Sequence, residues 1–527
     1  MSKLVNSFSN SLNPEKVPLV EASAEADEID DPTKWNDARD AKASVPTTAV
    51  NLICNIFGGA LLVLPTTMVN MSVIPGSIFV LIMGFCSTAS MAMLILSARS
   101  VSKYTYKDLL TSAFNDKAGK AFDIVLMLYT YGILVEYARI LADTMPSAMT
   151  DLVGHDGVWS HQLFWLGISF VIFWALSSLR RFSELKISSY LGVATIFYAV
   201  FLVITRYFMG TYSPPGQGGL NRPNIPWFRL STDFFKGIPV LSVSYSCHYN
   251  IAPFYREMKD RTAKKYLKAV LAAIPVISVS YIFVGITGVL MFGESCLEST
   301  GGDITKAFPQ SDTAAVVGRL GLFLHFSSVF PIIAMATRRC LNQLIFGSPI
   351  QPIYRYIIEA FFLVITSCTL AYLVKGIAEV LDLIGALFGL SIVYVIPSLV
   401  FIRLSPRVQE AEQARHDAKA NGNMECLAEV DEAEPTMLGD TVPMWLITFL
   451  RRLAYGLVVA GLLASIISFT ITLISAIKSS GQTPVSPLCF NFTDDWVGNA
   501  TPSPMSWAPN FTTVAPNMTA VPSTPSP

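Results

Sequence analysis

The stretch from Ser244 to Arg261 reads SYSCHYNIAPFYREMKDR and is the most informative segment of the sequence. It follows an apolar segment and turns within a few residues into a basic, charged loop. Its middle carries Ser246, His248, Asn250 and Pro253, which are poor residues for a helix that faces lipid. In a membrane protein, this mixture is typical of a helix that breaks beside a binding cavity. We therefore expect an interrupted helix here.

The composition indicates an all-α integral membrane protein. The chain has 527 residues, of which 52% are hydrophobic and 14% are charged, whereas soluble domains average about 25% charged residues. The net charge of −1 gives no support for nucleic-acid binding. No hydrolase elbow, phosphate loop or metal-spaced histidine cluster occurs, so we expect neither an enzyme nor a metal site.

Hydropathy predicts about eleven transmembrane helices. Their expected ranges are Val45–Val69, Val73–Ala98, Ala121–Met149, Leu163–Ser177, Ile187–Met209, Phe234–Tyr255, Ala269–Phe292, Ala314–Met335, Tyr356–Val374, Ile377–Ile402 and Trp445–Ile477. We divide the chain accordingly into a disordered tail (1–45), a ten-helix core (46–402), a polar loop (403–443), an eleventh helix (444–478) and a polar tail (479–527).

Loop charges predict the orientation of the chain. Lysine and arginine are concentrated in four alternate loops, at Arg99–Lys120, Ser178–Lys186, Arg256–Lys268 and Thr337–Arg355. The positive-inside rule places these loops, and with them the N-terminus, in the cytosol. The C-terminal tail then lies outside or in a lumen, where its four N-x-T sequons are expected to be glycosylated, at Asn491, Asn499, Asn510 and Asn517.

A second interruption is expected in the first span, at Gly58-Gly59. Glycine tolerates unusual backbone angles, and a break frees amides that suit a carboxylate and carbonyls that suit a cation. The first and sixth spans are corresponding positions if spans one to five and six to ten form inverted repeats. We therefore assign Gly58 and Gly59, with Ser244, Ser246 and His248, to one binding site.

Charged side chains inside spans are costly and are functional candidates. The third span carries Glu136, Arg139 and Asp143, whose spacing places them on one helical face. The structural alternative is an internal ion pair. The functional alternative is that Glu136 meets a cation, which is a substrate ammonium, a side chain or a proton.

Other polar residues in the spans have two interpretations. His248 either titrates between pH 5 and 8 or is a buried histidine bound to a carbonyl. In the eighth span, Ser327 and Ser328 either complete a cation site or bond back to their own helix. Cys296 and Cys489, both placed outside the cytosol, are a candidate disulfide pair.

The chain resembles the amino acid/auxin permease family, and within it the sodium-coupled neutral amino acid transporters. The resemblance is carried by Cys247-His248, Pro253, Tyr255 and Glu257–Arg261 after the sixth span, by Asn51-Leu52, Gly58 and Pro65 in the first, by Arg319-Leu320 to Pro331 in the eighth, and by Ile384–Ala386 and Pro397-Ser398 in the tenth.

The resemblance implies a leucine-transporter-type core of five plus five helices that moves amino acids by alternating access. It also implies a cation site on the first and eighth helices, which here falls on Cys54, Asn55, Ser327 and Ser328. Cys54 occupies the family's asparagine position, so both H⁺ and Na⁺ remain coupling ions, and no other cofactor is expected.

We expect a monomer in the lipid bilayer that binds an amino acid, with neutral amino acids favoured and the plasma membrane preferred to a lysosome or vacuole. Three alternatives stay open: a transporter of cationic amino acids, an exporter from an acidic organelle, and a transporter-like amino acid sensor.

Overall fold

The computed structural model describes residues 43–153, 157–178, 186–209, 225–251, 254–255, 258–259, 262–308, 312–347, 352–374, 377–420 and 441–479. The chain divides into two units, Met1–Cys489 and Phe490–Pro527, and all the described residues lie in the first. These residues are helical apart from connections and one isolated bridge between Ala43 and Met258.

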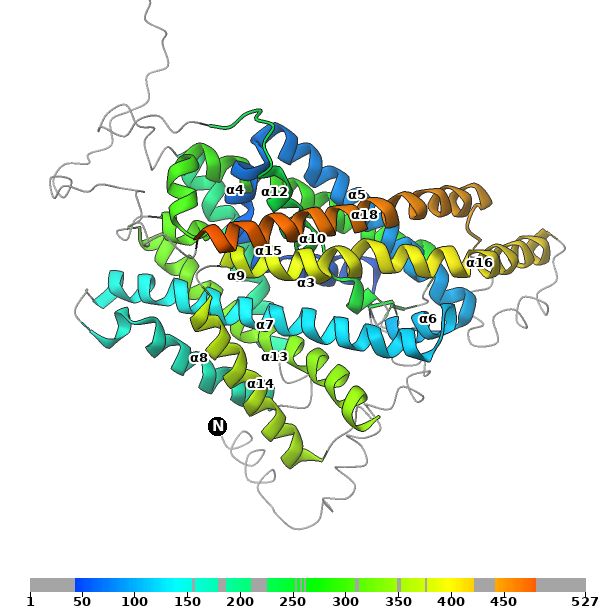
Figure 1. The fold of residues 1–527 in the computed structure, drawn as a ribbon, viewed down its shortest axis with the longest axis horizontal. Coiled ribbons are helices and arrows are strands. Elements are labelled where there is room, and N and C mark those ends of the chain that lie inside the picture. The colour runs from blue at the N-terminus through cyan, green and yellow to red at the C-terminus, as the bar shows by residue number, and fades with distance from the viewer. Residues whose placement is uncertain are drawn as a thin grey trace, which may run out of the picture. The chain divides into compact units, whose positions relative to one another are not determined.

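The main helices appear in Figure 1 in chain order. They are α3 (Val45–Ile56), α4 (Ala60–Met71), α5 (Val73–Val101), α6 (Tyr106–Ala113), α7 (Asp116–Val153), α8 (Gln162–Ser177), α9 (Lys186–Phe208), α10 (Phe234–Ser244), α12 (Ala263–Ser299), α13 (Thr313–Phe346), α14 (Ile353–Leu373), α15 (Ile377–Ile384), α16 (Ile396–Ala420) and α18 (Met444–Ser479).

Seven of the described helical segments are long and apolar enough to cross a membrane. The pair α3 and α4 makes an eighth span, bent by 65° at the predicted glycine break. In the predicted fourth and sixth spans, α8 and α10 are shorter, with 16 and 11 residues. In the predicted fifth span, the apolar segment of α9 is Ala194–Phe208, which is also shorter than the seven. The protein is therefore an all-helical integral membrane protein.

The centre of the fold is the pair α7 and α13, which lie against each other (Figure 1). The Tyr137 ring of α7 lies 4.9 Å from the Phe326 ring of α13. Farther along, the hydroxyl of Thr337 donates to that of Thr130 at 2.9 Å. This packing holds the inner face of α7 in one position relative to the other helices.

The tenth span is not a regular α-helix. Two π-helical segments, η7 (Gly385–Gly389) and η8 (Ser391–Val395), separate α15 from α16. At Gly385 the backbone approaches α10 so closely that a Cβ there would lie 2.7 Å from the carbonyl carbon of Pro239. Only glycine allows this contact, which fixes the height of α10 beside the tenth span.

Residues 403–420, predicted to begin a polar loop, are instead the second part of α16. The charged residues of this segment predict a polar loop, but Glu412 and Arg415 are both buried. The Glu412 carboxylate accepts from the Arg415 guanidinium at 2.6 Å and from the Val442 amide at 2.8 Å, and it lies 3.6 Å from Arg99. Paired charges thus stabilise the second part of α16.

Gly385→Ala is expected to destabilise the protein by about 1–3 kcal/mol, because the added methyl group forces backbone rather than a side chain to move. Gly456→Ala is the matched control, since a Cβ at Gly456 meets nothing within 4 Å. Thermal unfolding of both variants in detergent measures the difference. Equal melting temperatures would show that α10 and η7 are not locked together.

Candidate functional site

The first break leaves backbone donors free at the start of α4. The chain leaves α3 at Ile56, and Phe57 is extended, with φ −70° and ψ 99°. Within the described residues, the amides of Gly58, Gly59 and Ala60 donate no hydrogen bond. Free amides at a helix N-terminus carry partial positive charge and suit a carboxylate.

The second break follows α10, as predicted from the polar stretch. The helix ends at Ser244, and a 3₁₀ turn, η5 (His248–Asn250), follows. The Ser246 hydroxyl and the His248 Nδ1 atom are both buried. Ser246 lies near the side chain of Tyr129, and His248 Nδ1 has no hydrogen-bond partner in the described structure.

The side chains of His248 and Ser244 each make one hydrogen bond within the protein. His248 Nε2 lies 2.8 Å from the hydroxyl of Ser90 on α5, so its partner is a side chain and not the carbonyl that the structural alternative predicted. The Ser244 hydroxyl donates to the Val240 carbonyl within α10 at 2.8 Å. At the break, the group of Ser244 that remains for a ligand is therefore its backbone carbonyl.

A single hydroxyl joins the two breaks. Tyr281 of α12 is fully buried, and its hydroxyl lies 3.1 Å from the Ile56 carbonyl and 2.8 Å from the Ser244 carbonyl. Its ring packs on Phe57 and Tyr245. Because a phenol has one proton, it cannot fully satisfy both carbonyls, and one remains an acceptor for a cation.

The predicted charged face of α7 separates into two parts. Arg139 and Asp143 form an ion pair at 2.8 Å, and Asp143 also binds Lys306 at 2.9 Å and Gln162 at 3.1 Å. Glu136 takes no part in this network and makes no hydrogen bond or ion pair with any described residue. The internal ion pair expected as the structural alternative is therefore formed by Arg139 and Asp143, and Glu136 is not part of it.

Glu136 lies directly against the first break. It is 2% exposed, and a Cβ added at Gly59 would overlap its Oε1 atom and lie 3.2 Å from its Cδ atom. The Gly59 position is therefore occupied by the Glu136 carboxyl group. Gly58 is less crowded, because its Cβ would lie 3.6 Å from the Tyr137 hydroxyl.

Three tyrosines lie close enough to this carboxyl group to feel its charge, and they were not singled out from the sequence. Tyr129 and Tyr137 of α7 and Tyr249 of η5 all interact electrostatically with Glu136. The rings of Tyr129 and Tyr249 lie 6.4 Å apart. The spacing of seven between Tyr129 and Glu136, which puts both on one helical face, was the available signal.

The residues predicted to bind a cation differ in whether their side-chain atoms already have a hydrogen-bond partner. Asn55 Oδ1 and Ser327 Oγ are buried without a hydrogen-bond partner in the described residues. The Ser328 hydroxyl donates to the Leu324 carbonyl at 2.7 Å, as the structural alternative expected. Cys54 is a free, half-buried thiol. A cation site at Asn55 and Ser327 stays a prediction.

Several predicted positions lie outside the described residues. These are Pro253, Cys489 and the four sequon asparagines, Asn491, Asn499, Asn510 and Asn517. Cys296 is part of a disulfide.

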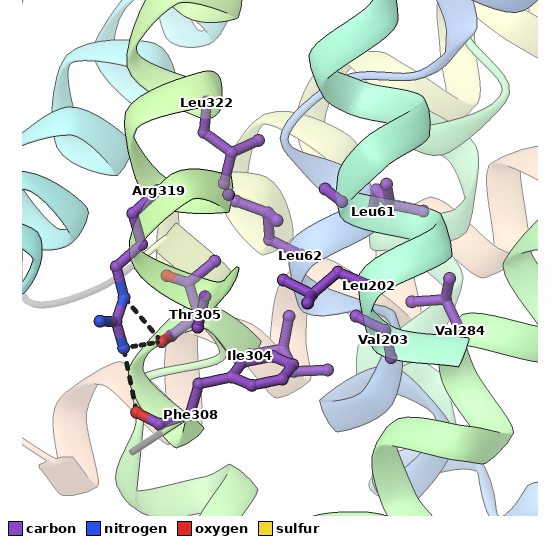
Figure 2. A pocket seen from close by; sticks show the side chains of 13 residues that line it. Leu61, Leu62, Leu202, Val203, Val284, Ile304, Thr305, Phe308, Arg319 and Leu322 are labelled. Atoms are coloured by element: carbon purple, nitrogen blue, oxygen red, sulfur yellow. Dashed lines mark hydrogen bonds between the residues drawn. The ribbon is translucent and has the colours of Figure 1, made fainter. Parts of the chain in front are cut away.

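A small apolar cavity lies beyond the first break and not at it. It is lined by Leu61 and Leu62 of α4, together with residues of α9, α12 and α13 (Figure 2). Its volume of about 30 Å³ holds roughly two water molecules and no amino acid. On one side, buried Arg319 donates to the carbonyls of Thr305 at 2.8 Å and Phe308 at 3.0 Å.

The Tyr281 contact can be tested by stability. Tyr281→Phe leaves the Ile56 and Ser244 carbonyls without this donor in a buried place, so we expect a loss of about 1–3 kcal/mol. Tyr198→Phe is the control, because its hydroxyl donates to the Ala314 carbonyl away from both breaks. Melting temperatures in detergent compare the two, and a larger loss in Tyr198→Phe would contradict the central role of Tyr281.

The chain is similar to several amino acid transporters. The "Amino acid transporter AVT6E" of Arabidopsis thaliana is 26% identical over 375 residues, covering 67% of this chain and 75% of that protein. The "Vacuolar amino acid transporter 6" of Saccharomyces cerevisiae is 24% identical, covering 58% and 67%. "Solute carrier family 38 member 10" of Rattus norvegicus is 22% identical, covering 69% and 33%.

Among solved structures, the fold is similar to Mhp1, a nucleobase-cation-symport-1 family transporter in a closed conformation with bromovinylhydantoin bound. The TM-score is 0.45 at 10% sequence identity, with 84% of this chain and 94% of that chain covered. The profile of the family described as "Transmembrane amino acid transporter protein" matches residues 41–420. Since this match spans well over half of the sequence and includes both helix breaks, the chain belongs to that family of transporters, which are not enzymes.

Proposed function

We propose that the protein is a secondary active amino acid transporter that works by alternating access, with H⁺ or Na⁺ as coupling ion and neutral amino acids as favoured substrates. The observation that carries this proposal is the meeting of two helix breaks at Tyr281. Free amides begin α4 on one side, and incompletely satisfied carbonyls end α3 and α10 on the other.

This arrangement suits the two charges that every amino acid shares. The substrate carboxylate would meet the amides of Gly58, Gly59 and Ala60, where the α4 dipole favours an anion. The substrate ammonium would take the carbonyl of Ile56 or Ser244 that the Tyr281 proton leaves unsatisfied. A site that recognises only the carboxylate and ammonium groups of the substrate favours amino acids with neutral side chains.

Alternating access requires that the site open to each side in turn. We propose eleven transmembrane helices whose first ten form two inverted repeats, with the α3–α4 and α10–η5 breaks at corresponding positions. On the outer side, η6 (Ile304–Ala307) is held by the Arg319 hydrogen bonds and by the Lys306–Asp143 ion pair. An outward-open state would have to release these contacts.

The membrane in which the protein works is part of the proposal. The loop charges support a cytosolic N-terminus and a C-terminus outside or in a lumen. We expected the plasma membrane, but a yeast relative is named a vacuolar transporter, which supports export from an acidic organelle as the second candidate. Localisation of a tagged protein separates the two, because the topology is the same in both membranes.

Uptake by purified protein in liposomes tests the function. A panel of radiolabelled neutral, cationic and acidic amino acids is run with a sodium gradient, with choline, and with a pH gradient. We expect saturable uptake of neutral amino acids that one of the gradients stimulates. Binding without uptake in every condition would instead identify a sensor, and uptake confined to cationic amino acids would overturn the substrate preference.

Two neighbouring glycines give a matched pair for the site. Gly59→Ala pushes aside only the ends of the Glu136 and Ile140 side chains, so the fold is kept while the site is displaced. We expect roughly 10-fold to 100-fold slower uptake. Gly58→Ala, whose methyl group makes an ordinary contact with Tyr137, is expected to lose less. Uptake normalised to reconstituted protein measures both, and the reverse order would contradict the placement of the site.

A further inference from the structure

We propose that Glu136 carries the coupling proton, because its carboxyl group lies where the substrate carboxylate has to bind. The inference rests on the proposed transport function and adds the identity of the coupling ion and the residue that holds it.

The geometry places a buried acid at a site built for an anion. The Glu136 carboxyl group fills the position of a Gly59 Cβ, next to the free amides that begin α4. Glu136 is 2% exposed and has no hydrogen bond or ion pair among the described residues. A helix N-terminus and an unpartnered acid thus point at the same small volume.

No described residue places a cation against Glu136 that would hold it as an anion. The groups that interact with it are the phenols of Tyr129, Tyr137 and Tyr249. Several charged or titratable groups on α7 and on the elements packed against it have other partners in the described structure. These pairs are Arg139 with Asp143, Lys306 with Asp143, Lys107 with Asp123, Arg319 and Arg338 with carbonyls, Glu359 with Asn342, and His325 against Phe326. A buried carboxyl group without a cation is more stable as the neutral acid.

Competition for one set of amides couples the proton to the substrate. Two carboxylates at the start of α4 would repel each other, as paired acids do when they share a site. If Glu136 is protonated, it becomes a hydrogen-bond donor and can face a substrate carboxylate without repulsion. The proton binds to Glu136 from the side where the substrate enters and leaves on the other side after the substrate has gone.

A sodium ion is the alternative to the proton as coupling ion. The Gly59 Cβ position is crowded by the Ile140 side chain as well as by Glu136. The unpartnered Asn55 and Ser327 oxygens are separate candidates for Na⁺. A sodium arm in the experiment therefore tests the alternative directly.

The test compares wild type with Glu136→Gln and Asp123→Asn in liposomes. Asp123 is a buried acid on the same helix that pairs with Lys107 at 2.7 Å, so Asp123→Asn is the matched control. Each protein is assayed for accumulation driven by a pH gradient, for accumulation driven by a sodium gradient, and for exchange of labelled against unlabelled amino acid without a gradient.

Wild type and Asp123→Asn are expected to accumulate substrate with the pH gradient. Glu136→Gln, which mimics the permanently protonated acid, is expected to lose a larger share of pH-driven accumulation than of gradient-free exchange, and its exchange is expected to have a flat pH profile. Accumulation by Glu136→Gln equal to wild type, or accumulation by wild type with sodium alone, would overturn the inference and leave the transport function standing. Absence of uptake and exchange in wild type would overturn both.

A second measurement decides the case in which Glu136→Gln does not fold. Unbuffered wild-type protein in detergent is mixed with substrate, and proton uptake is followed with a pH dye. We expect about one proton taken up per substrate bound above the pH at which the free acid ionises. Binding without proton uptake at every pH between 5 and 9 would overturn the inference.

Discussion

The hydroxyl of Tyr281 lies between the carbonyls of Ile56 and Ser244, at 3.1 and 2.8 Å. Inside a bilayer, a break in a helix exposes backbone groups that no water is present to satisfy, and each unsatisfied group costs several kcal/mol. Two breaks in one fold are stable when the same side chain provides a hydrogen bond to the exposed carbonyl groups of both. The phenol supplies it for the two helix ends, while the packing of its ring on Phe57 and Tyr245 keeps it in place.

The remaining helices hold this meeting point. Pairing of α7 with α13 presents Glu136 to Gly59, and the close backbone contact of Gly385 with Pro239 sets α10 beside the tenth span. In the described structure the amides of Gly58, Gly59 and Ala60 at the start of α4 are left free, and the Glu136 carboxyl group lies beside Gly59. Positive charge from backbone groups and a neutralisable negative group thus meet at one point of a largely apolar interior.

Much of this could be predicted from the sequence, for identifiable reasons. The glycine pair and the run of polar residues after Val243 marked both breaks, because regular lipid-facing helices do not tolerate them. The separation of Glu136 from Arg139 and Asp143 could not be predicted, because spacing on a helix gives a common face but not the partner on another element. Tyr281 escaped notice for the same reason. Its role depends on two carbonyls that are distant in the sequence, and the side chain itself is an ordinary tyrosine in an apolar span. The extension of α16 to Ala420 was missed because its stabilising charges are buried only in the folded chain.

The carboxylate of Glu412 accepts from Arg415 near the end of α16 and from the amide of Val442 just before α18. One carboxylate therefore joins the last turns of α16 to the residue that precedes α18. The register between the two helices depends on the charge of this single side chain, so a change that removes that charge would act on both helices at once.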